Sequence, residues 1–129
     1  MKKFLIFAVM MTGMVIAAQS QAQTLQYPFG AAEYQSVTAT NDSVQFTVSN
    51  RVSWVYSSID STTVVKATVA SHITNGAILY VELAADGTNR TVTFSGLTGP
   101  STTFTASKTR ILTFVYRGGY KLVSSAQIN

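Results

Sequence analysis

The chain offers few residues that could do chemistry, and its only histidine, His72, is the first of them. It lies between Ala70 and Asn75, just before an Asn-Gly turn. A catalytic triad would need a serine nucleophile and a carboxylate beside it, but the sequence contains no Gly-x-Ser-x-Gly elbow. We therefore predict a surface-loop histidine rather than a general base.

Five carboxylates are the next candidates: Glu33, Asp42, Asp60, Glu82 and Asp86. A glycosidase needs two of them facing each other across a cleft. The three aspartates lie in turn contexts, where aspartate accepts hydrogen bonds from nearby backbone. Glu82 lies mid-strand on the same side as Ile78 and Tyr80, and we expect it to pair with a cross-strand cation or to sit in a polar subunit contact.

Metal and phosphate chemistry have no sequence basis here. The chain has no cysteine, no His or Asp cluster with ligand spacing and no phosphate-binding glycine-rich loop. We predict a protein that is not an enzyme, with no catalytic residue, no cofactor and no metal. Without disulfides, a domain of this size gains only modest stability from its own core, which favours oligomerisation.

Aromatic side chains remain as binding candidates. They are Trp54, Tyr56, Tyr80, Tyr116 and Tyr120. Together they could form a platform on which sugars stack, but a small β-domain needs several large side chains inside it. We expect them to fill the core or an interface, and keep the sugar platform as the alternative.

Residues 1–22 have the features of a secretory signal peptide. Lys2 and Lys3 precede an apolar stretch from Phe4 to Ala18, and Ser20 and Ala22 fit a cleavage site. The stretch is shorter than the ~20 residues that span a bilayer. We predict cleavage after Ala22 and export to the periplasm, the cell surface or the medium, with no membrane contact afterwards.

The charge of the exported chain is small. Loss of Lys2 and Lys3 leaves seven basic against five acidic residues, a net charge of +2. The remaining basic residues are scattered singly rather than clustered, so we predict no binding to nucleic acid.

The rest of the chain reads as strands and turns. Residues 23–39 form an N-terminal arm with turn chemistry around Pro28 and Gly30. Alternating or β-branched runs then predict strands at 44–48, 52–57, 64–70, 77–85, 90–94 and 101–105, with a hairpin within 111–124. Asn75-Gly76 and Asp86-Gly87 favour tight hairpins between neighbouring runs. Residues 40–129 are therefore predicted to be an all-β, antiparallel, jelly-roll-like β-sandwich of seven to eight short strands.

The last hairpin predicts an interface. A two-residue type I′ turn at Gly118-Gly119 would pair Val115 with Leu122 on one side and Phe114 with Val123 on the other. Both sides then carry apolar groups, whereas a lone sandwich needs only one such side. The predicted interface residues are Tyr27, Phe29, Tyr80, Phe114, Tyr116, Tyr120, Lys121 and Val123.

Two stretches also resemble a known module. The run from Asn75 to Phe94, with its Asp-Gly-Thr turn and Arg-Thr-Val-Thr-Phe strand, and the run from Ala106 to Leu122 are similar to hairpins of bacteriophage tail-fibre, head-fibre and capsid-decoration proteins. The resemblance covers roughly residues 40–129. It implies a β-sandwich, often trimeric, without enzymatic activity. Arg117 stands where such modules have aspartate, and a signal peptide is unusual for a virion protein.

Three roles follow as hypotheses. The first is a non-enzymatic structural subunit, phage-virion-like, that forms a homo-oligomer, with a trimer favoured. The second is an exported bacterial binding module for a glycan or a cell-surface partner. The third is an extracellular fibre subunit in which the arm adds to a neighbour's sheet.

Overall fold

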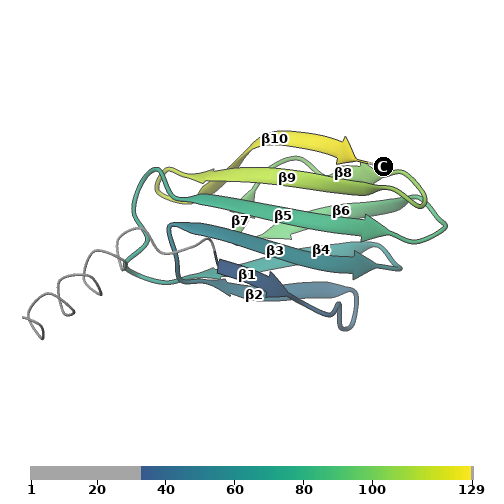
Figure 1. The fold of residues 1–129 in the computed structure, drawn as a ribbon, viewed down its shortest axis with the longest axis horizontal. Helices are drawn as coiled ribbons and strands as arrows, with labels where there is room; N and C mark the ends of the chain where they lie inside the picture. The colour runs from purple at the N-terminus through teal and green to yellow at the C-terminus, as the bar shows by residue number, and fades with distance from the viewer. Residues whose placement is uncertain (1–32, 129) are drawn as a thin grey trace, which may run out of the picture. The chain divides into compact units, whose positions relative to one another are not determined.

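The computed structural model describes residues 33–128, which form ten strands and no helix (Figure 1). The strands are β1 (Glu33–Ser36), β2 (Ser43–Val48), β3 (Val52–Ile59), β4 (Thr63–Val69), β5 (Ile78–Ala85), β6 (Arg90–Ser95), β7 (Leu97–Thr98), β8 (Thr102–Phe104), β9 (Thr109–Tyr116) and β10 (Tyr120–Ile128). The predicted all-β class is confirmed. The predicted signal peptide and residues 23–32 of the predicted arm lie outside the described residues.

The strands form two sheets, and the chain passes back and forth between them. One sheet has six strands in the order β1-β3-β5-β9-β10-β7, and the other has four in the order β2-β4-β6-β8. The first six strands alternate strictly between the sheets. As a result β1, β3 and β5 run parallel in one sheet, while β2, β4 and β6 run parallel in the other. We call this path from β1 to β6 the alternating path.

The prediction of antiparallel pairing and of seven to eight strands is wrong. Five of the eight strand pairings are parallel, and ten strands lie within 33–128. The turns at Asn75-Gly76 and Asp86-Gly87 do reverse the chain, but each joins strands of opposite sheets. A turn can lead into a neighbouring strand of the same sheet or into a strand of the opposite sheet. Both cases show the same apolar alternation in the sequence, so the sequence does not distinguish them.

One hydrophobic core fills the space between the two sheets. Its fully buried side chains include Val44 and Val48 of β2, Leu79 and Leu83 of β5, and Phe104 of β8. Phe94 of β6 packs edge-on against Phe114 of β9, with ring centroids 5.4 Å apart. The strands of each sheet therefore expose one side to this shared core and turn the other side outward.

The β9–β10 hairpin is present, but its register differs from the prediction. Tyr120 pairs with Tyr116 and Leu122 with Phe114, so the loop has three residues, Arg117 to Gly119, rather than two. Both glycines of the loop have positive φ (65° and 153°). A bulge after Leu122 then restores the predicted pairing of Ser124 with Thr113. The predicted two-residue turn is wrong because the bulge absorbs the additional loop residue.

The first strand lies at the start of the alternating path, where its polar side chains bind the neighbouring loop and strand. β1 belongs to the stretch predicted as an arm, and it pairs in parallel with the first half of β3. Glu33 accepts hydrogen bonds from the Ser49 hydroxyl (3.1 Å) and the Asn50 amide (2.9 Å). The Gln35 amide donates to the Thr47 carbonyl of β2 (2.9 Å). These contacts tie the first strand of one sheet to the first strand of the other.

Candidate functional site

The outward side of the six-stranded sheet is the most unusual surface of the described residues. Along β3, β5 and β9 its side chains are Val52, Trp54, Tyr56, Ser58, Ile78, Tyr80, Glu82, Ala84, Thr109, Ile111, Thr113 and Val115. Eight of these twelve are hydrophobic, although they point away from the core. We call this surface, together with Tyr34 of β1 and Ile128 of β10 at its two borders, the aromatic face.

The strand register lines up the rings of the aromatic face. Tyr34 of β1 pairs with Trp54 of β3, and Trp54 pairs with Tyr80 of β5. The rings of Trp54 and Tyr80 lie 4.9 Å apart between centroids, tilted by 32°, so they stack on each other across the strands. Glu82 lies two residues beyond Tyr80 and accepts a hydrogen bond from the Trp54 indole nitrogen at 2.9 Å. This hydrogen bond satisfies the indole N–H. Within 33–128 the cross-strand partner of Glu82 is therefore this indole and not the cation that was predicted.

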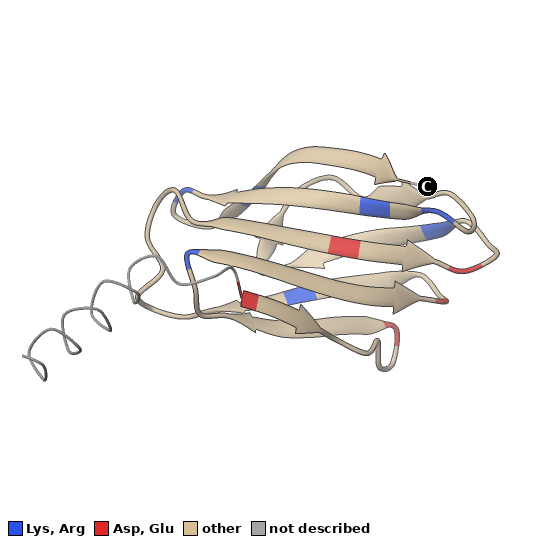
Figure 2. Ribbon diagram, in the orientation of Figure 1, with Lys and Arg blue, Asp and Glu red and all other residues tan. Residues whose placement is uncertain are grey.

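The exposed large hydrophobic residues of the described chain all belong to this sheet. They are Tyr34 (63% exposed), Val52 (38%), Val123 (60%) and Ile128 (41%), on β1, β3 and β10. Figure 2 shows that the strands of this sheet are largely free of charge and that most charged residues lie near strand ends. A surface of this composition is typical of a contact that is covered in an assembly.

The structure divides the predicted interface residues into three groups. Tyr80 lies on the aromatic face, while Lys121 and Val123 are exposed on β10 beside it. Phe114 and Tyr120 are fully buried in the core, and Tyr116 packs against that core. Tyr27 and Phe29 lie outside the described residues.

The prediction that Phe114 and Tyr120 lie at an interface is therefore corrected. The three-residue loop turns Tyr120 to the same side as Phe114, and that side faces the core. The Tyr116 and Tyr120 rings then meet edge-on at 5.1 Å. Because the Tyr120 hydroxyl is buried without a hydrogen-bond partner, burial raises its pKa, and the nearby Tyr116 adds to the shift.

The sugar platform proposed for five aromatic residues is not assembled as one surface. Tyr116 and Tyr120 lie on the core side, whereas Trp54, Tyr56 and Tyr80 lie on the aromatic face. Of these three, Trp54 and Tyr80 cover part of each other's ring by stacking. Tyr56 alone is left beside an open hollow.

Two titratable residues away from the aromatic face, His72 and Asp86, are engaged in local structure. The His72 ring lies exposed, with Nε2 2.6 Å from the Ser49 carbonyl oxygen, as a donor would be. Asp86 accepts the Thr88 backbone N–H (3.2 Å), as the turn context predicted, and both Nε (2.8 Å) and a terminal nitrogen (2.6 Å) of Arg90. The Arg90 guanidinium holds the pKa of the Asp86 carboxyl below its ordinary value. No group of three potential metal ligands occurs within 33–128.

Two contributors to the aromatic face were not singled out by sequence reasoning. Tyr34 lay in a stretch read as an arm, because four residues are too few to show a strand pattern. Ile128 lay beyond the predicted end of the last strand. In the structure this strand continues to Ile128, and all its residues after Ser124 are exposed. A hydrophobic residue on an otherwise polar strand end was the available signal.

Neither a protein-family model nor a curated protein sequence matches this chain. Within 33–128 there is no helix that is long and apolar enough to cross a membrane.

Proposed function

We propose that this protein is a non-enzymatic assembly subunit that associates with further copies of itself through the aromatic face. One observation carries the proposal: the six-stranded sheet is rich in hydrophobic side chains on both of its sides. One side is covered by the four-stranded sheet. The other has no cover among the described residues, and leaving it in water forfeits the free energy that burial would give.

The composition of the face favours a second copy as the partner. Its one carboxylate is Glu82, and the one ammonium beside it is Lys121. A face with so little charge offers nothing to a strongly acidic or basic partner, but two copies related by a two-fold axis can bring Glu82 of each copy toward Lys121 of the other.

The size of the face also fits a contact between copies. Eight-residue strands span about 26 Å, and four adjacent strands span about 19 Å, which gives on the order of 500 Å² in projection. Side-chain relief adds to that area, so the face approaches the roughly 600–800 Å² per partner of specific small interfaces. The stacked rings of Trp54 and Tyr80 present edges and hydrophobic surface, which suit packing against another protein.

The wider role follows from the sequence and stays a proposal. We propose an exported subunit of phage-virion-like type, a fibre or decoration domain, supported by the resemblance of its hairpin motifs and by the uncovered face. A trimer is the assembly that the resemblance implies, whereas direct face-to-face packing gives a two-fold dimer.

Light scattering coupled to size exclusion on the purified protein tests the assembly. We expect a homo-oligomer whose mass identifies dimer or trimer. Ile111→Lys should raise the dissociation constant about tenfold or more, since an ammonium on the face must be desolvated. Folding should survive, because the new lysine would lie opposite Glu82.

The matched control is Val64→Lys. Val64 is also half-buried and outward-facing, but it belongs to the four-stranded sheet, so its replacement should leave the mass unchanged. A protein that stays monomeric at millimolar concentration would overturn the proposal, as would equal effects of the two substitutions.

A further inference from the structure

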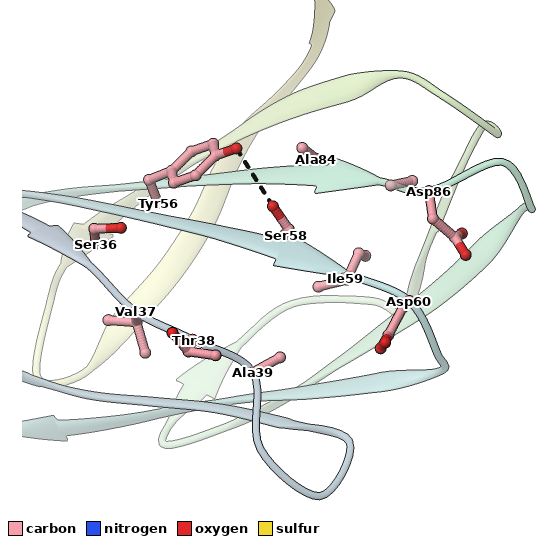
Figure 3. Close-up of a pocket in the computed structure, with 11 residues that line it drawn as sticks. Ser36, Val37, Thr38, Ala39, Tyr56, Ser58, Ile59, Asp60, Ala84 and Asp86 are labelled. Carbon is pink, nitrogen blue, oxygen red and sulfur yellow. Dashed lines mark hydrogen bonds between the residues drawn. The ribbon is translucent and has the colours of Figure 1, made fainter.

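A hollow of about 490 Å³ lies at one corner of the six-stranded sheet, where β1 ends (Figure 3). Its walls come from three places: the end of β1 with the segment after it, the second half of β3, and the end of β5. It lies at the border of the aromatic face, since Tyr56, Ser58 and Ala84 belong to both, but Trp54 and Tyr80 are not among its lining residues. The inference drawn from it goes beyond the proposed assembly, and it requires that the contact between copies leaves this corner open.

The hollow exists because β1 is half as long as its neighbour. β1 has four residues and β3 has eight, so β1 reaches only as far as Tyr56. The Val37 N–H bonds to the Tyr56 carbonyl at 2.8 Å, and the ladder then stops. By strand alternation, the N–H and C=O of Ser58 point toward the same open edge. Small side chains at Ser58 and Ala84 keep the space above the sheet unfilled.

The lining is rich in hydroxyl groups. Ser36, Thr38, Tyr56 and Ser58 each contribute one, and the Tyr56 hydroxyl lies 3.4 Å from the Ser58 hydroxyl. Figure 3 shows the Tyr56 ring leaning along its strand toward Ser58, so that the ring forms one wall of the hollow.

The charges in the lining are all negative. Two carboxylates, Asp60 and Asp86, close one end, and no lysine, arginine or histidine lines the space. Asp86 is already held by Arg90, with contacts of 2.8 and 2.6 Å. Asp60 makes no side-chain hydrogen bond with any residue in 33–128, so it is the acceptor left for a ligand. Anionic ligands are disfavoured because nothing in the lining would neutralise them.

We propose that this hollow binds a neutral sugar ring. An aromatic wall packs against the C–H groups of a sugar, and a carboxylate accepts hydrogen bonds from two neighbouring hydroxyls. Tyr56 supplies the wall and Asp60 the acceptor, while the Ser58 backbone N–H donates to a ring hydroxyl. A few placed polar groups beside one aromatic surface is the usual composition of small-ligand sites.

Titration of the isotope-labelled full-length protein with uncharged methyl glycosides of glucose, galactose, mannose and N-acetylglucosamine tests the site by NMR. At about 50 mM glycoside, at least one should shift the amide signals of Ser58 and Asp60, because shallow single-sugar sites bind in the millimolar range. Sodium phosphate at the same ionic strength should not shift them. The proposal fails if phosphate alone shifts these signals or if no glycoside does.

Two substitutions assign the roles. Tyr56→Ala and Asp60→Asn should each weaken binding of the active glycoside about tenfold. Tyr34→Ala, on the neighbouring strand of the same face, and Asp42→Asn, in a turn outside the hollow, should leave it unchanged. Binding that persists in both Tyr56→Ala and Asp60→Asn would overturn the proposal. Because Ile111 lies outside the lining, Ile111→Lys separates this result from the assembly test.

Discussion

The outward sides of the two sheets are built on the same backbone pattern but have opposite compositions. On β3, β5 and β9 eight of twelve outward side chains are hydrophobic. On the four-stranded sheet the side chains on the outward side are Ser43, Gln45, Thr47, Val64, Lys66, Thr68, Thr91, Thr93, Ser95 and Thr103, of which only Val64 is hydrophobic. Threonine keeps the β-branched shape that strands favour while giving water a hydroxyl.

Folding alone therefore does not require an aromatic outer face. The threonine-rich side shows how this chain makes a strand surface that can stay in water. Placing Trp54 and Tyr80 on the other side is therefore a departure from that solution, and an exposed hydrophobic sheet carries the risk of unspecific association. A specific contact between copies is the use that we propose for it.

The largest expected effect concerns Gly96, where the chain crosses from β6 to β7 and so from one sheet to the other. Its φ is +74°, and an added Cβ would overlap the Ala67 carbonyl oxygen of β4. Gly96→Ala should lower the free energy of unfolding by about 3 kcal/mol or more, since both backbone strain and overpacking contribute. Denaturant unfolding measures it.

Gly87→Ala is the control for this crossing, because an added Cβ there meets no atom within 4 Å. Its free energy of unfolding should change by less than about 0.5 kcal/mol. Equal losses of stability in the two variants would contradict the prediction that the close approach to the Ala67 carbonyl oxygen requires glycine at position 96.

A smaller effect is expected for the Trp54–Glu82 hydrogen bond of the aromatic face. A double-mutant cycle with Trp54→Phe and Glu82→Ala should give a coupling free energy of about 1.5 kcal/mol, because the acceptor is charged. The cross-strand pair Thr47 and Thr68 is the counterpart on the other sheet. The same cycle with valine there should give less than about 0.5 kcal/mol. Equal couplings would show that the two faces are held together alike.

The smallest effect contrasts the two sides of the six-stranded sheet. Tyr120→Phe removes a buried hydroxyl that has no partner and should raise the free energy of unfolding by about 1 kcal/mol. Tyr34→Phe, on the exposed side, should leave it unchanged. Thermal unfolding at neutral pH compares them, and a loss of stability in Tyr120→Phe would show that the hydroxyl is in fact satisfied.

The pH dependence of Tyr120 has a definite sign. Its folded pKa is raised above the ordinary value of 10.0, so the unfolded chain loses this proton first. The stability that depends on a neutral Tyr120 phenol is fully present below pH 10 and is lost as the pH rises through the folded pKa. The Tyr120→Phe variant should therefore lose less stability than the parent above pH 10, and identical alkaline curves would contradict this.

The sequence predicted the strands well and their partners poorly. The runs around Phe46, Trp54 and Leu83 were correctly read, because alternation and turn residues are local signals. The pairing depends on which strand lies across the core, and no local feature at Asn75-Gly76 or Asp86-Gly87 distinguishes the two cases. Strand β7, with two residues, is too short to show any pattern.

The aromatic face was predicted in part. An uncovered hydrophobic side was expected from the last hairpin, and Tyr80 was expected on the same side of its strand as Ile78 and Glu82, as the alternation of β5 has it. The burial of Tyr120 was not predicted, because the additional loop residue turns Tyr120 to Leu122 to the other side before the bulge restores the register. Phe114 was expected on the side that needs a cover, but it lies on the core side of β9. The hollow was not predicted either, since it depends on the length difference between β1 and β3.

The alternating path of β1 to β6 has a consequence for how such a chain can change over evolution. Each turn of the alternating path, one strand in each sheet, adds one strand to both sheets. A duplicated turn of this kind would therefore widen the two sheets together by about 4.8 Å. The β9–β10 hairpin with β7 beside it, and the polar contacts of Glu33, would stay where they are, at the two ends of the six-stranded sheet. The extent of the two sheets would thus change in whole turns of this path, and their ends could be inherited unchanged.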